Sequence, residues 1–172
     1  MALAKNKYPI VGFRYEVSII PEPQFSGTMA NIASVATSAS GADSASFSEI
    51  SGISVSIETE EVKNAGDVSQ EVPFERKFSP LVLKRGLSEA KSELVKWVTA
   101  CMLSDVVEKN STITKSIIVK LLSDTGEPLV YWVFVGAHPT KWSVSGLKAM
   151  SNELVIEEIE LRYKFFYPVF VG

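Results

Sequence analysis

Several segments of this chain alternate apolar and polar residues with a period of two, the pattern of half-buried β-strands. The first runs from Val11 to Ile20, where Pro21 ends it. The second begins at Phe47 and ends at a turn over 63–67, where Asn and Gly supply left-handed backbone conformations. Further strand-like runs cover 72–85, 113–122, 129–135 and 154–166. A chain with this pattern is predicted to be mainly antiparallel β-structure.

Interruptions within these runs predict bulges and sheet edges. Gly52 predicts a bulge, and Pro80 must lie at an edge or a bulge because proline has no N–H. The run 154–166 is the longest expected strand, and its apolar register switches at Glu157 and Glu158, which predicts a bulge there. Residues 139–152 follow neither period and are predicted to be irregular or shortly helical.

One segment has the helical period instead. Its apolar stripe consists of Ala90, Leu94, Trp97, Val98 and Cys101. Ser88 is the expected N-cap. The fold class predicted is therefore a two-sheet antiparallel β-barrel or sandwich with one flanking α-helix at about residues 88–103. Trp97 should face inward, and residues 124–128 should form the turn of a hairpin over 113–135.

The stretch 22–46 differs from the rest because it is rich in Ser, Ala, Gly and Thr and carries little charge. Its apolar residues Met29, Ile32 and Val35 are spaced by three. Two interpretations stay open: a flexible surface loop, or a short helix or small-residue contact surface. A connection of this length inside a domain is uncommon and often functional.

Length and composition limit the possible classes of protein. The 172 residues suit a single domain over 1–172, and one Cys with one His leaves no disulfide and no Cys/His zinc cluster. A net charge of −3 does not favour binding to a phosphate backbone. No signal peptide or membrane-length apolar run is seen, so we expect a protein made in the cytoplasm. The mean hydropathy of +0.16 favours a subunit that buries surface in an assembly.

A search for catalytic residues yields little. His138 precedes Pro139 in a loop-like context, and Cys101 lies on the apolar helix stripe, so neither is expected to react. The glutamates at 58, 60 and 61 and at 157, 158 and 160 are most simply solvated strand faces. Lys84 and Arg85 lack the glycines of a phosphate-binding loop. We expect no enzymatic activity, no cofactor and no metal.

Three segments together resemble the tail tube protein family of contractile phages and phage-derived contractile injection systems, whose fold is shared by the haemolysin-coregulated tube protein. The first is Phe47–Ile53 with the Glu-rich strand that follows it, and the second is Leu81–Leu87, which leads into the Trp97 helix. The third combines the segments 132–134, 137–142, 147–149, 152–153 and 156–163. The resemblance covers about residues 12–163.

This resemblance implies a non-catalytic structural subunit of an inner tube. It implies homo-hexameric rings that stack into a hollow tube inside a contractile sheath, with baseplate or spike hub proteins as further partners and cargo in the lumen. The subunit itself would not insert into a membrane. It would belong to a phage tail or injection particle, including particles released from the cell. A specialised ring near the baseplate is one hypothesis, because 22–46 is a small-residue-rich insertion and 164–172 an apolar C-terminal extension.

The resemblance also implies roles for individual residues. Contacts between subunits are expected of Val62, Lys63, Asn64, Gly66, Asp67, Lys84, Arg85, Gly86, Phe165, Phe166 and Phe170. Core anchors are expected to be Trp97, Trp132 and Trp142. The lumen face is expected to include Glu58 and Glu60. Gly86 should permit, at the corner between strand and helix, a backbone conformation that other residues adopt less readily. The apolar tail should dock either on its own barrel or on an adjoining ring.

Two other classes of protein compete with the tube subunit. A monomeric β-barrel that binds a small ligand would need a polar cluster inside a pocket, and no such cluster is evident. A cofactor-dependent split-barrel enzyme would need basic residues converging on a phosphate, and only Lys84 and Arg85 lie close together. Oligomeric state separates these classes, because a tube subunit forms rings. The sequence does not distinguish a phage tail from an injection particle.

Overall fold

The computed structural model describes residues 14–20, 44–63, 69–87, 92–103, 114–147 and 153–170. Within these ranges the elements are β1 (Arg14–Ile20), β2 (Ser44–Phe47), β3 (Glu49–Ser51), β4 (Val55–Lys63), β5 (Ser69–Phe78), β6 (Leu81–Gly86), α2 (Glu93–Leu103), β7 (Lys115–Leu122), β8 (Pro128–Val144), β9 (Ile156–Arg162) and β10 (Phe165–Phe170). All strand pairs are antiparallel, as the alternating sequence predicts.

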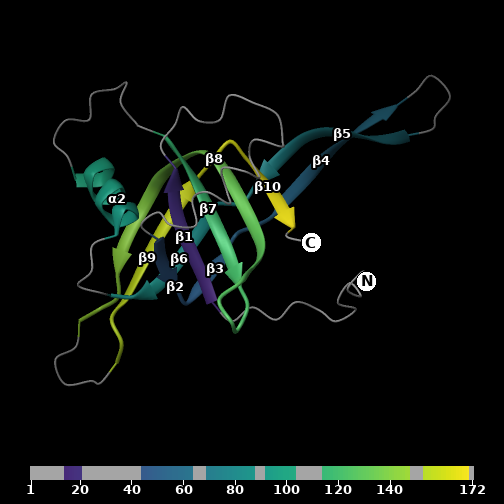
Figure 1. Ribbon diagram of the computed structural model, residues 1–172. Helices are drawn as coiled ribbons and strands as arrows, with labels where there is room; N and C mark the ends of the chain where they lie inside the picture. The colour runs from purple at the N-terminus through teal and green to yellow at the C-terminus, as the bar shows by residue number, and fades with distance from the viewer. Residues whose placement is uncertain are drawn as a thin grey trace, which may run out of the picture.

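Strand β8 belongs to two sheets and joins them. Its first half pairs with β7 on one side and β10 on the other, while its second half pairs with β9. The first sheet has the order β2-β1-β7-β8-β10, and the second runs β8-β9-β6-β3. Gly136, with φ of +64°, lies at the bend between the two halves. The described strands therefore form a two-layer sandwich, one of the two predicted forms, and not a closed barrel (Figure 1).

The core lies between the two sheets and under α2. Val17, Phe134, Leu83 and Ile159 are fully buried there, together with Leu94 of the helix. Burying one such side chain contributes about 1.5–3 kcal/mol. The helix packs on β8, β1 and β2 and turns Trp97 inward, as its apolar stripe predicts. None of the described helices combines the length and apolar character of a membrane span.

The hairpin of β7 and β8 forms where the sequence predicts it. Ser123 Oγ accepts a hydrogen bond from the Glu127 amide at 3.0 Å, and Gly126 adopts φ of +85°. Such a left-handed position is one that glycine fills without a steric penalty.

Two strand predictions near the C-terminus are wrong. Residues 139–144 are not irregular, because β8 continues through Pro139 to Val144 and is the longest described strand. The extra residue at Thr140 forms the bulge, and its hydroxyl donates to the Glu160 carbonyl at 3.3 Å. No bulge occurs at Glu157 and Glu158, since β9 pairs with β6 in continuous register. The predicted run 154–166 is instead divided into β9 and β10.

The helix and the Gly52 region also differ from expectation. Helix α2 begins at Glu93, where Ser92 Oγ accepts from the Val95 amide at 3.4 Å, so Ser92 is the N-cap; Ser88 lies outside the described residues. Gly52 lies between β3 and β4 with φ of +87°. An added Cβ there would lie 1.8 Å from the Pro80 carbonyl oxygen, so only glycine fits. Of the 22–46 segment, Ser44 to Ser46 belong to β2 and 22–43 lie outside the described residues.

Candidate assembly surfaces

The hairpin of β4 and β5, called here the arm (residues 55–63 and 69–78), projects from the sandwich on the side away from α2 (Figure 1). Its two strands form a separate two-stranded sheet. Every residue of the arm except Phe78 is exposed. The exposed residues include large apolar side chains, namely Val55, Ile57, Val62, Val72 and Phe74, and Phe74 is 72% exposed. The alternation in β4 therefore does not mark a face that the described residues of this chain bury.

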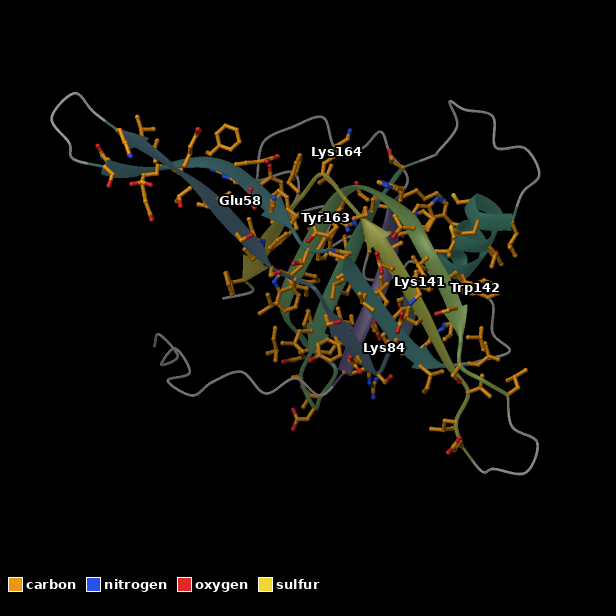
Figure 2. All side chains as sticks on the ribbon, turned by 180° about the vertical axis from the view of Figure 1, so that it is seen from behind. Glu58, Lys84, Lys141, Trp142, Tyr163 and Lys164 are labelled. Atoms are coloured by element: carbon orange, nitrogen blue, oxygen red, sulfur yellow. The ribbon has the colours of Figure 1, made fainter. Side chains whose placement is uncertain are left out.

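The arm is also acidic. Its described residues include Glu58, Glu60, Glu61, Glu71 and Glu75. Glu58 forms an ion pair with Lys77, and this hydrogen bond raises the pKa of the Lys77 ammonium group (Figure 2). In the strand register Glu61 stands directly opposite Glu71. The register shifts near Pro73, where β5 carries one extra residue and the missing proline N–H is tolerated.

An aromatic cluster attaches the arm to the sandwich. The Phe78 ring lies 5.9 Å from the ring centroids of both Tyr163 and Phe166. The Tyr163 hydroxyl donates to the Ser79 carbonyl at 2.8 Å, and burial raises the pKa of this phenol. Next to this cluster lies a groove of about 350 Å³, lined by Arg76, Lys77, Phe78, Ser79, Arg162 and Tyr163. We call it the root groove; Figure 2 shows Tyr163 at this end of the arm.

Alternating charges cross the outer face of the second sheet. Lys84 of β6 pairs with Glu49 of β3 at 3.0 Å, and Lys141 of β8 pairs with Glu158 of β9 at 2.7 Å (Figure 2). The hydrogen bond from Lys141 lowers the pKa of the Glu158 carboxyl and raises that of the ammonium group. Lys84, a predicted assembly residue, is thus held on this charged face by a strand neighbour.

Beneath that face, Arg85 and Glu157 form a buried ion pair that sequence reasoning missed. Arg85 Nε lies 2.7 Å from Glu157 Oε2, with side-chain exposures of 9% and 2%. Trp142 Nε1 donates to the other carboxylate oxygen at 2.9 Å, and the guanidinium lies over the Phe47 ring. The signal was present in the sequence, because Glu157 shares odd-numbered positions with the buried Ile159 and Leu161.

The expectation for Gly86 is wrong. Its backbone is not among those with positive φ, and an added Cβ would meet nothing within 4 Å. Alanine would therefore fit at this strand end, because neither backbone conformation nor space demands glycine.

The C-terminal segment docks on its own chain, one of the two predicted arrangements. Residues 165–170 form β10, which pairs with the first half of β8. Phe166 packs 5.5 Å from Phe134, and Phe165 is half-buried. Phe170 at the end of β10 is 71% exposed.

The remaining predicted residues fall into three groups. Trp97 is buried, and Trp132 and Trp142 are half-buried against the same core. Val62 and Lys63 end β4, with Glu58 and Glu60 on the same strand. The turn residues Asn64, Gly66 and Asp67 lie outside the described residues.

The two candidate reactive residues occupy structural positions. His138 lies within β8, opposite Arg162 of β9, rather than in a loop. Cys101 is half-buried on α2, and burial raises the pKa of its thiol, opposed by the charge of Lys115. In the described part of the chain, no three His, Cys, Asp or Glu side chains are grouped to hold a metal ion.

The family model described as T4-like virus tail tube protein gp19 matches residues 11–166 of this sequence. The chain belongs to this family. It is accordingly a structural subunit of the inner tube of a contractile tail or contractile injection system. No curated protein matches the sequence.

Solved structures show how widely this tail tube fold is shared. A chain of the extracellular contractile injection system PVC, in its extended sheath–tube complex, is 23% identical with a TM-score of 0.72, covering 96% of this chain and 95% of that chain. A chain of the anti-feeding prophage baseplate is 22% identical with a TM-score of 0.68, covering 95% and 97%. Hcp1 from Salmonella typhimurium is 13% identical with a TM-score of 0.51, covering 92% and 88%. At these identities the likeness shows the fold alone.

Proposed function

We propose that this subunit forms six-fold rings that stack into a hollow tube, and that the arm makes contacts between neighbouring subunits. The observation that carries the proposal is the exposed arm with its apolar side chains. An isolated two-stranded sheet is only marginally stable in water, and an exposed apolar strand pair promotes association. The arm therefore needs a surface that the described residues of its own chain do not supply.

A neighbouring subunit is the natural source of that surface. Burial of Phe74 and Ile57 against a second copy would remove apolar area from water. Permanent interfaces of this kind commonly bury about 2,000 Å² or more. We infer a non-catalytic role, which suits a family of structural tube proteins.

The proposed partners are a contractile sheath and a baseplate, with cargo inside the tube. Two solved structures support this: one is a sheath–tube complex and another is a baseplate symmetrised six-fold. The subunit would then be part of a phage tail or an extracellular injection particle. We also propose that Glu58 and Glu60 face the lumen and give it a negative wall.

Two segments suggest a specialised ring near the baseplate. Phe170 keeps most of its surface exposed after β10 has paired with β8, so the proposed partner of this apolar edge is an adjoining ring or baseplate protein. Residues 22–43 are proposed to adapt the subunit to the same partner.

Negative-stain electron microscopy of the purified protein tests the tube assignment. We expect rings with a central hole and six-fold symmetry, or stacked tubes. Uniform monomers that persist at high concentration and with baseplate proteins added would contradict it. Retention of a small molecule by such monomers would instead support a ligand-binding β-domain.

A further inference from the structure

We propose that Glu61 and Glu71 of one arm dock in the root groove of a second copy of this chain, on its Arg76 and Arg162. The proposal rests on the proposed function, because it names the surface that receives the arm. It names the residues on both sides of this contact, the acidic side on the arm and the basic side in the root groove.

The donor half is a pair of carboxylates held side by side. Glu61 and Glu71 are direct cross-strand partners, so their side chains share one face of the arm. Like charges in this arrangement destabilise an isolated hairpin. Both side chains are exposed, and neither forms an ion pair with another described residue. A pair of cations from outside the arm would remove this repulsion.

The receiving half is a basic groove with aromatic walls. Three of its six lining residues are cationic and none is acidic. Lys77 is already paired with Glu58, whereas Arg76 and Arg162 form no ion pair among the described residues. Guanidinium groups bind carboxylates through two parallel hydrogen bonds, and Phe78 and Tyr163 add aromatic surface to the same groove. Two guanidiniums thus match two carboxylates.

Glu71 of an arm cannot pair with Arg76 in the root groove of the same chain. Glu71 and Arg76 lie five residues apart on β5, which is about 16 Å of extended strand. A charged hydrogen bond needs contact within about 3 Å. The two surfaces must therefore meet between copies. Because they are different surfaces, the contact can repeat head-to-tail, and this repetition produces the closed ring or open stack that the proposed function requires.

Charge reversal with rescue tests the proposal on the full-length protein. The variant Arg76→Glu/Arg162→Glu should raise the concentration needed for assembly at least tenfold, measured by sedimentation and electron microscopy. Adding Glu61→Arg/Glu71→Arg to the same chain should restore assembly. Glu61→Arg/Glu71→Arg without the groove substitutions should weaken assembly as Arg76→Glu/Arg162→Glu does. The control Arg14→Glu/Lys96→Glu carries the same change in net charge on exposed positions outside the arm and groove, and should assemble normally.

Each result separates this docking from the tube assignment. Circular dichroism should show folded protein for every variant, because all substituted residues are outside the core. The docking is overturned, and the tube assignment stands, if Arg76→Glu/Arg162→Glu assembles like the unchanged protein. The same holds if the variant with all four substitutions does not regain assembly. Groove variants that assemble but lose binding to a poly-glutamate peptide would assign the groove to acidic cargo, which also overturns it. If the unchanged protein forms neither rings nor tubes, the proposed function fails and the docking fails with it.

Discussion

At the scale of single residues, the Arg85–Glu157 ion pair is the contact whose loss should cost most. Replacing Arg85 with Met leaves a carboxylate that is 2% exposed, and among the described residues the Trp142 indole is then its one side-chain donor. Breaking one side of a buried pair typically lowers the free energy of unfolding by about 3–5 kcal/mol. We expect a loss of that size for Arg85→Met in chemical denaturation of the unassembled protein. The control Lys84→Met removes the neighbouring exposed pair and should cost less than about 1 kcal/mol.

The double variant Arg85→Met/Glu157→Leu shows whether the unpaired Glu157 carboxylate causes that loss of stability. Apolar side chains of similar volume can replace a buried ion pair at little cost. The double variant should therefore be more stable than Arg85→Met alone. If it is equally or less stable, the loss comes from packing around Phe47 and Trp142 and not from the unpaired carboxylate.

At the scale of elements, β10 offers a matched pair of substitutions. Phe166 packs against Phe134, Tyr163 and Phe78, whereas Phe170 on the same strand is 71% exposed. Phe166→Ala should lower the free energy of unfolding by about 3 kcal/mol, and Phe170→Ala by less than about 0.5 kcal/mol. Denaturation curves measure both. Phe170→Ala should instead weaken binding of rings to their partner, and equal stability losses would show that β10 is not docked as described.

The sequence predicts well those elements whose burial is determined by residues close to them in the chain. The Trp97 stripe reflects one local face turned toward the core, and the alternation of β1 correctly places Val17 there, although Ile20 on the other face of β1 is buried in a second cluster. The extension of β8 beyond Pro139 was not predictable in this way, because it depends on pairing with β9 and on a bulge at Thr140.

The candidate surfaces were harder to predict for a related reason. Ile57 alternates as a core residue does but is 59% exposed, because the described residues of this chain do not cover it. Glu157 appeared to belong to a solvated cluster, and its burial depends on two partners distant in sequence, Arg85 and Trp142. The pattern therefore located the arm's strands but not their exposure.

At the scale of the whole molecule, the two faces of the arm carry different groups of acids. Glu58 and Glu60 are two residues apart on β4 and share a face, while Glu61 points to the other face. One face can therefore contact a neighbouring copy while the other lines the lumen. With Glu58 and Glu60 on the lumen face, as proposed, a ring would repeat these acids in every subunit and its wall would be negative.

Reversing those two charges should change the lumen and leave assembly intact. For Glu58→Lys/Glu60→Lys we expect rings at the unchanged yield, because loss of the exposed Glu58–Lys77 pair costs little. Small anionic gold clusters should enter and decorate the central hole of the variant but not of the unchanged protein in electron micrographs. The control Asp124→Lys/Glu127→Lys makes the same change in net charge on the exposed turn between β7 and β8, and should leave the hole undecorated. Loss of rings would instead place Glu58 and Glu60 in a contact between subunits, because a reversed charge that faces only solvent does not prevent association.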